Sequence, residues 1–228
     1  MAYIFIILTL LALYIATIFI MGRMKNTKIV NLIFFITIFS LYVMYVLQVL
    51  LIQGHKSIYF HGVLASANVS PFMFSTLPIV YFSRGRVQTY LYGLIALLSV
   101  GMMLSPILNA VTYALNDIPF QILAVWDYIA HLGLSLWGIY LVRSNQVKIE
   151  LKSSIFSALI ILSVALFMLV HNLIFDTTFF GLSLNGKHNI YGNVLTENSF
   201  LSAGIYFSGL CAILVAGYFY SRSFKKAS

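Results

Sequence analysis

The chain has 228 residues, of which 61% are hydrophobic and 8% are charged, a composition far outside the range of soluble globular domains. Its formal net charge of +8 does not indicate nucleic-acid binding, because lysine and arginine collect in the cytoplasmic loops of membrane proteins. One cysteine, Cys211, excludes a disulfide framework and a thiolate metal cage within one chain. We therefore expect an integral membrane protein.

Apolar runs long enough to cross a membrane follow one another along the chain. A hydrocarbon core about 30 Å thick requires roughly 20 apolar residues of helix, and runs of this length without alternation predict helices, not strands. Seven spans are predicted, at residues 2–21, 29–52, 63–83, 88–109, 119–142, 154–174 and 200–221. The expected fold is an all-α polytopic membrane bundle of seven transmembrane helices, a single domain over residues 1–228.

The positions of the cations predict the orientation of these spans. Every lysine and arginine except Lys56 and Lys187 falls after the first, third or fifth span or in the C-terminal tail. Because lysine and arginine favour cytoplasmic loops, this alternation predicts a multi-pass protein with its N-terminus outside and its C-terminus inside. The cations of the first span follow its apolar run, which favours a membrane helix over a cleaved signal. The short loops suit a bacterial plasma membrane.

The fifth span carries two ionisable residues, Asp127 and His131, in the stretch VWDYIAHLGLSLWGIYLV. Residues four apart lie on one helix face, so a carboxylate at Asp127 can orient an imidazole at His131. This geometry supports general-base catalysis or a proton relay. The alternative is a polar pair that only holds helices together in lipid. Since ionisable groups inside a membrane are costly, we favour a functional pair.

Other polar residues reach a similar depth in neighbouring spans. Together they predict a polar cavity that opens toward the outer leaflet, although helix capping is an alternative for each residue taken alone. Two prolines in the third span, Pro71 and Pro78, are expected to bend that helix and to expose hydroxyl or backbone groups to such a cavity. The candidate substrate-binding residues are His171, Asn172, Trp126, Asn68 and Asn109.

This arrangement resembles a known family, the YwaF-type bacterial integral membrane proteins and their eukaryotic relative, transmembrane protein 164. The resemblance covers residues 30–221 and rests on the order and spacing of the spans. The family's third span carries Leu-Pro-x-His-x-Cys; here SPFMFS keeps Pro71 but has Met73 and Ser75 at the histidine and cysteine positions. His131, in AHLGLSLWGIYLV, matches the family's fifth span. The resemblance implies acyl transfer between lipids, with His131 as base.

A serine in place of the family's cysteine requires a base in contact with its hydroxyl. If the third and fifth spans adjoin, the catalytic set is Ser75 as nucleophile, His131 as base and Asp127 as orienting acid, with His171 and Asn172 as oxyanion donors. The expected partner is a membrane lipid, with no nucleic acid, no metal and no other cofactor. The alternatives are a proton-coupled small-molecule transporter and a non-catalytic scaffold subunit bound to another membrane protein.

Overall fold

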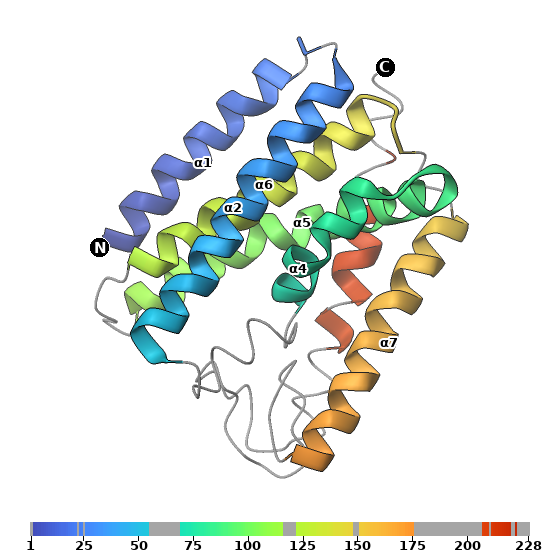
Figure 1. The fold of residues 1–228 in the computed structure, drawn as a ribbon. Helices are drawn as coiled ribbons and strands as arrows, with labels where there is room; N and C mark the ends of the chain where they lie inside the picture. The colour runs from blue at the N-terminus through green and yellow to red at the C-terminus, as the bar shows by residue number, and fades with distance from the viewer. Residues whose placement is uncertain are drawn as a thin grey trace.

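The structure is a computed structural model that describes residues 2–21, 23–24, 26–54, 69–115, 122–147, 151–175, 207–209, 211–219 and 222. Within these ranges the chain is helical with short connecting turns, and no strand occurs (Figure 1). The helices are α1 (Ala2–Met21), α2 (Thr27–Gln53), α4 (Val69–Phe82), α5 (Gly85–Leu115), α6 (Ile122–Arg143) and α7 (Leu151–Phe175).

Each of these helices coincides with a predicted span, and the all-helical membrane-type fold is confirmed. Five of them, all except α4, are long and apolar enough to cross a membrane. α4 and the segment Phe207–Phe219, which fall on the third and seventh predicted spans, form shorter apolar helices. The count of seven spans and their orientation stay predictions.

The lengths of α4 and α5 depart from the length of one hydrocarbon crossing. At 1.5 Å per residue, the 14 residues of α4 extend about 21 Å and the 31 residues of α5 about 46 Å. Pro71 lies in the first turn of α4, where a missing N–H removes no helical hydrogen bond. The helix continues through Pro78. α5 likewise continues through Pro106 and extends past both ends of the predicted span 88–109.

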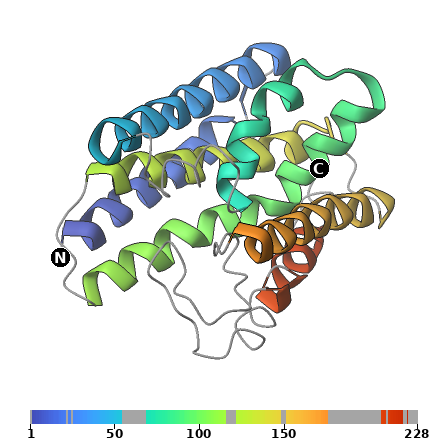
Figure 2. The same cartoon turned by 60° about the horizontal axis from the view of Figure 1, so that its bottom comes forward.

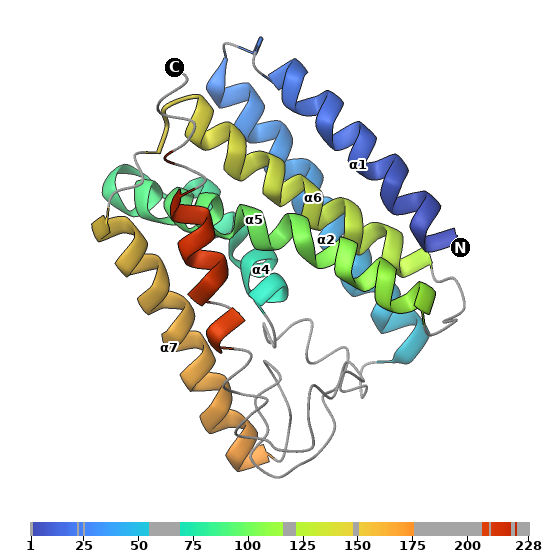
Figure 3. The ribbon, with the colours of Figure 1, turned by 180° about the vertical axis from the view of Figure 1, so that it is seen from behind.

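The helices surround a central pair, α5 and α6, whose mutual contact is the most extensive among the described helices. α1 and α2 lie along α6, while α4 packs against both α2 and α5 (Figures 1 and 2). α7 packs on α5, and the segment Phe207–Phe219 lies beside α7 in Figures 1 and 3. α6 is the most buried of the five membrane-length helices.

Small residues permit the close approach of α5 and α6. A Cβ atom placed on Gly138 of α6 would lie 2.7 Å from the Cβ of Ser99, 2.9 Å from the carbonyl oxygen of Ile95 and 3.2 Å from the Cα of Ala96. Helices in lipid associate largely by such packing, because the surrounding acyl chains are as apolar as the side chains. Gly138 therefore sets the separation of the two central helices.

Polar side chains then join α6 to its neighbours. The hydroxyls of Tyr14 on α1 and Ser135 on α6 lie 2.9 Å apart. The indole N–H of Trp137 donates to the side-chain oxygen of Asn31 on α2 at 3.1 Å, and the Arg143 guanidinium donates to the carbonyl of Ile18 at 3.3 Å. The bonds of Ser135 and Trp137 are buried, so no water competes for them and each fixes α6 against a particular neighbour, whereas the bond of Arg143 lies at the exposed end of α6.

Candidate functional site

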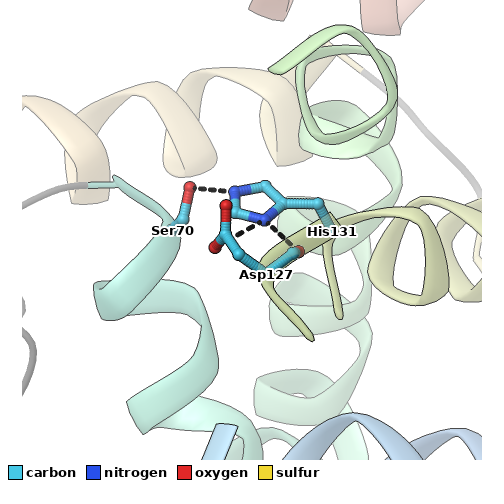
Figure 4. A network of polar contacts seen from close by, with 3 residues as sticks. All are labelled: Ser70, Asp127 and His131. Carbon is cyan, nitrogen blue, oxygen red and sulfur yellow. Dashed lines mark hydrogen bonds and ion pairs between the residues drawn. The ribbon is translucent and has the colours of Figure 1, made fainter. Parts of the chain in front are cut away.

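The side chains of Asp127 and His131 contact each other on one face of α6, as their spacing predicts. The Nδ1 atom of His131 lies 2.8 Å from the backbone carbonyl oxygen of Asp127 and 3.2 Å from its carboxylate Oδ1 (Figure 4). Both of these oxygens are acceptors, so the proton of the neutral imidazole resides on Nδ1. Nε2 is then the basic nitrogen, and it points away from α6.

A serine of α4 occupies the position in front of that basic nitrogen. The Oγ of Ser70 lies 2.7 Å from Nε2 of His131, so the hydroxyl donates to the ring in the neutral tautomer (Figure 4). Ser70 is the second residue of α4, and Asp127 contacts the other ring nitrogen. The three residues form a Ser-His-Asp arrangement, in which a carboxylate orients a base and the base contacts a hydroxyl.

Burial and an aromatic contact hold the imidazole in place. His131 is 3% exposed, whereas the side chain of Asp127 is 28% exposed. The ring of Phe74, one turn after Ser70 on α4, meets the imidazole edge-on with centroids 5.3 Å apart and an interplanar angle of 90°. Two successive turns of α4 therefore contact His131, and this fixes the rotation of α4 about its own axis.

The predicted nucleophile, Ser75, is not the serine that contacts His131. Its Oγ donates to the carbonyl of Phe72 in its own helix at 3.0 Å. Residues five apart are rotated by about 140° around a helix, so Ser70 and Ser75 cannot both face one partner. The third and fifth predicted spans adjoin at Ser70, and the predicted contact between Ser75 and His131 is not formed.

Among the described residues, His171, Asn172 and Asn109 are not in the contacts given above for Ser70, His131 and Asp127. Asn68 lies outside the described residues. His171 and Asn172 lie in the last two turns of α7, which packs on α5, and the hydrogen bonds described at His131 include neither of them. Asn109 lies on α5, partly buried.

Trp126 precedes Asp127 on α6 and has a buried indole N–H without a hydrogen-bond partner. Such a donor inside a protein is costly, because its lost hydration is not replaced. The residue therefore keeps a donor available on α6 next to the acidic member of the site.

The sequence pattern did not indicate Ser70 as the nucleophile, although the stretch SPFMFS has a serine at each end. In the structure the two serines differ in their position in the helix: Ser70 lies in the first turn, before Pro71, and Ser75 lies in the interior. A first turn has backbone N–H groups without acceptors inside the helix. Pro71 contributes none, so the N–H group of Ser70 itself is the one next to the hydroxyl.

Two kinds of chemistry fit the geometry of these three residues. A hydroxyl bonded to a basic imidazole nitrogen is a nucleophile in acyl transfer, and the carboxylate stabilises the imidazolium that forms. The same chain of bonds also provides a path for a proton. No group of three or more His, Cys, Asp or Glu side chains that could hold a metal ion occurs in the part of the chain that the structure describes.

Comparison with protein-family models, with characterised proteins and with solved structures finds no match to this chain. The resemblance to YwaF-type proteins therefore stays a prediction.

Proposed function

We propose that the protein transfers an acyl group from one membrane lipid to a second acceptor, through an acyl ester formed on Ser70. The observation that carries the proposal is the 2.7 Å contact between Ser70 Oγ and His131 Nε2, with Asp127 holding the opposite nitrogen. A serine is a weak nucleophile unless a base removes its proton, and His131 is placed to do so. A lipid substrate is proposed because α4 and α6 belong to a membrane-type bundle.

In the first half of the reaction, Ser70 Oγ adds to the carbonyl carbon of a lipid ester while its proton moves to His131 Nε2. Collapse of the tetrahedral intermediate breaks the bond to the leaving oxygen, which takes the proton back from Nε2. In the second half, the hydroxyl of an acceptor lipid, or water, adds to the acyl carbon and gives its proton to Nε2; the bond from that carbon to Ser70 Oγ then breaks, and Nε2 returns the proton to Oγ. Asp127 stabilises the imidazolium in both halves.

The negative charge of the tetrahedral intermediate requires hydrogen-bond donors beside Ser70. His171 and Asn172 were expected in this role, but they lie on α7. We assign it instead to the backbone N–H group of Ser70, which lies in the first turn of α4 at the positive end of the helix dipole.

The test compares two serines of the same helix. Purified protein is incubated with a labelled lysophospholipid and a diacyl donor, and diacyl product is measured by mass spectrometry. We expect Ser70→Ala and His131→Ala to lower the rate by about 10³-fold or more, whereas Ser75→Ala keeps the parent rate. A fluorophosphonate probe should label the parent and the Ser75→Ala variant but not Ser70→Ala. Transfer or labelling retained in Ser70→Ala would overturn the proposal.

The second candidate is a proton-coupled carrier. It is favoured by the difference in exposure between Asp127, at 28%, and the nearly buried His131, since a proton could enter at the carboxylate and pass to the ring. In proteoliposomes that contain a pH-sensitive dye, an imposed potential would then drive proton entry through the parent but not through Asp127→Asn. Ser70→Ala would retain proton entry only if the hydroxyl is not part of the path.

A further inference from the structure

A cavity of about 450 Å³ opens at the opposite end of α4 from Ser70. Phe82, in its lining, follows Ser70 by twelve residues, so the two places are roughly 18 Å apart along the helix axis. The cavity is therefore separate from the proposed catalytic site. We call it the basic pocket, and its lining includes Lys28, Asn31, Arg84, Gln88, Tyr92 and Gln146.

The charge in this pocket is positive. Lys28 lies in the first turn of α2, and Arg84 directly precedes the first residue of α5. Neither helix has an acidic residue in its first turn, so the positive ends of both helix dipoles add to the two cations. Asp127, the acidic residue that the structure describes, is paired with His131. Within the described ranges no carboxylate neutralises the pocket.

The floor of the pocket is polar and fixed. Asn31 is 6% exposed, and because its side-chain oxygen accepts from the Trp137 indole, its amide N–H₂ faces Gln146, whose Oε1 lies 2.6 Å away. Tyr92 is 5% exposed, and its hydroxyl oxygen accepts from Gln88 at 3.3 Å and from Asn31 at 3.5 Å. The hydroxyl hydrogen of Tyr92 is then left as a donor toward the pocket.

The size and the surroundings indicate what kind of anion fits. A volume of about 450 Å³ lies within the range of small-molecule sites, and it accommodates an anionic group together with an organic portion. Phe82, in the lining, is 70% exposed. Ile29, which follows Lys28, is 53% exposed, and Val87, in the first turn of α5 after Arg84, is 58% exposed. A ligand whose charged group sits in the pocket can therefore lay an apolar portion against α2 and α4.

We propose that the basic pocket binds a phosphate group carried by an organic molecule. Phosphate has the charge to pair with Lys28 and Arg84 and the oxygens to accept from the Tyr92 hydroxyl. The exposed apolar side chains beside the pocket favour an anionic phospholipid over a soluble phosphate ester as its source. The pocket lies among the loops predicted to be cytoplasmic, where basic pockets between membrane helices receive acidic head groups.

The test measures ligand binding to the full chain in a neutral detergent by native mass spectrometry. The ligands are phosphatidylglycerol, phosphatidylcholine as a zwitterionic lipid of matched chain length, and glycerol 3-phosphate as a soluble ester. The variant Lys28→Gln with Arg84→Gln removes both pocket cations. The matched control, Arg23→Gln with Arg86→Gln, removes two exposed cations from the same loops but outside the lining.

We expect the parent to bind one phosphatidylglycerol at least tenfold more tightly than phosphatidylcholine. The lining variant should lose this preference, with a Kd at least tenfold higher, while the control pair keeps it. Glycerol 3-phosphate that binds as tightly as phosphatidylglycerol, and is lost in the lining variant, would support the phosphate site and assign it to a soluble ester. Equal binding by parent and lining variant, or an equal loss in the control pair, would overturn the proposal.

Discussion

Substitution of Gly138 by alanine should separate the two central helices. The added Cβ would lie 2.7 Å from the Cβ of Ser99 and 2.9 Å from the carbonyl oxygen of Ile95, whereas non-bonded carbon atoms prefer about 3.5–4.0 Å. Neither neighbour can rotate away, because one is backbone and the other is the first atom of a side chain. α6 must therefore move away from α5 by several tenths of an ångström or more.

Gly93, on α5, provides a matched control. A Cβ placed there would lie 3.8 Å from the Cβ of Ser153, which is an ordinary contact. Glycine and alanine differ in helix propensity by about 0.5–1 kcal/mol, and this gain applies to Gly93→Ala and Gly138→Ala alike. The difference in free energy of unfolding between the two variants therefore isolates the steric cost at Gly138. Overpacking of a close interface costs about 1–3 kcal/mol.

Equilibrium unfolding in mixed micelles, with SDS added to the detergent-solubilised protein, measures this difference. Tryptophan fluorescence is a suitable signal, because Trp137 is fully buried near the α5–α6 interface. We expect Gly93→Ala to be as stable as the parent or more stable, and Gly138→Ala to be less stable than Gly93→Ala by about 1–3 kcal/mol. Equal stability of the two variants would refute the assignment of Gly138 as the residue that sets the helix separation.

Two further predictions concern the attachment of α1 and the orientation of the chain. Tyr14→Phe and Ser135→Ala should each destabilise the protein, and their double-mutant cycle should give a coupling of roughly 0.6 kcal/mol in the same unfolding assay, since that is typical of hydrogen bonds between membrane helices; a coupling of zero would contradict the bond between them. In a Cys211→Ser background, a membrane-impermeant maleimide added to intact cells should label Lys56→Cys and leave Arg84→Cys unlabelled. Labelling of Arg84→Cys from outside would refute the predicted orientation.

The helices were predictable because the length of an apolar run is a local property of the sequence. The ends of the helices were less predictable, as α5 shows. Its span was predicted to stop at residue 109, where polar residues begin, but the helix continues to Leu115. Tyr113, near that end, packs edge-on against Tyr3 of α1 with ring centroids 5.1 Å apart. Contact with a distant helix, which no hydropathy pattern contains, keeps these last turns helical.

The candidate site likewise has one part that is local in the sequence and one part that depends on how distant helices pack. The Asp127–His131 pair follows from the four-residue spacing of a single helix, and the structure has it. The choice between Ser70 and Ser75 depends on how α4 is rotated and shifted against α6, and one sequence carries no information on that register. The family pattern indicated Ser75, whereas the contacts of Ser70 and Phe74 with His131 determine the rotation that α4 adopts.

The hydrogen bonds between α6 and its neighbours bear on how the helices insert into the membrane during synthesis. α6 is the least apolar of the five membrane-length helices and contains a charged pair, so it has the weakest tendency to enter a bilayer by itself. Its partners for Ser135, Trp137 and His131 lie on α1, α2 and α4, all of which leave the ribosome earlier. When α6 is synthesised, acceptors and donors for its polar groups are already present, and its insertion is an assembly step on an existing scaffold.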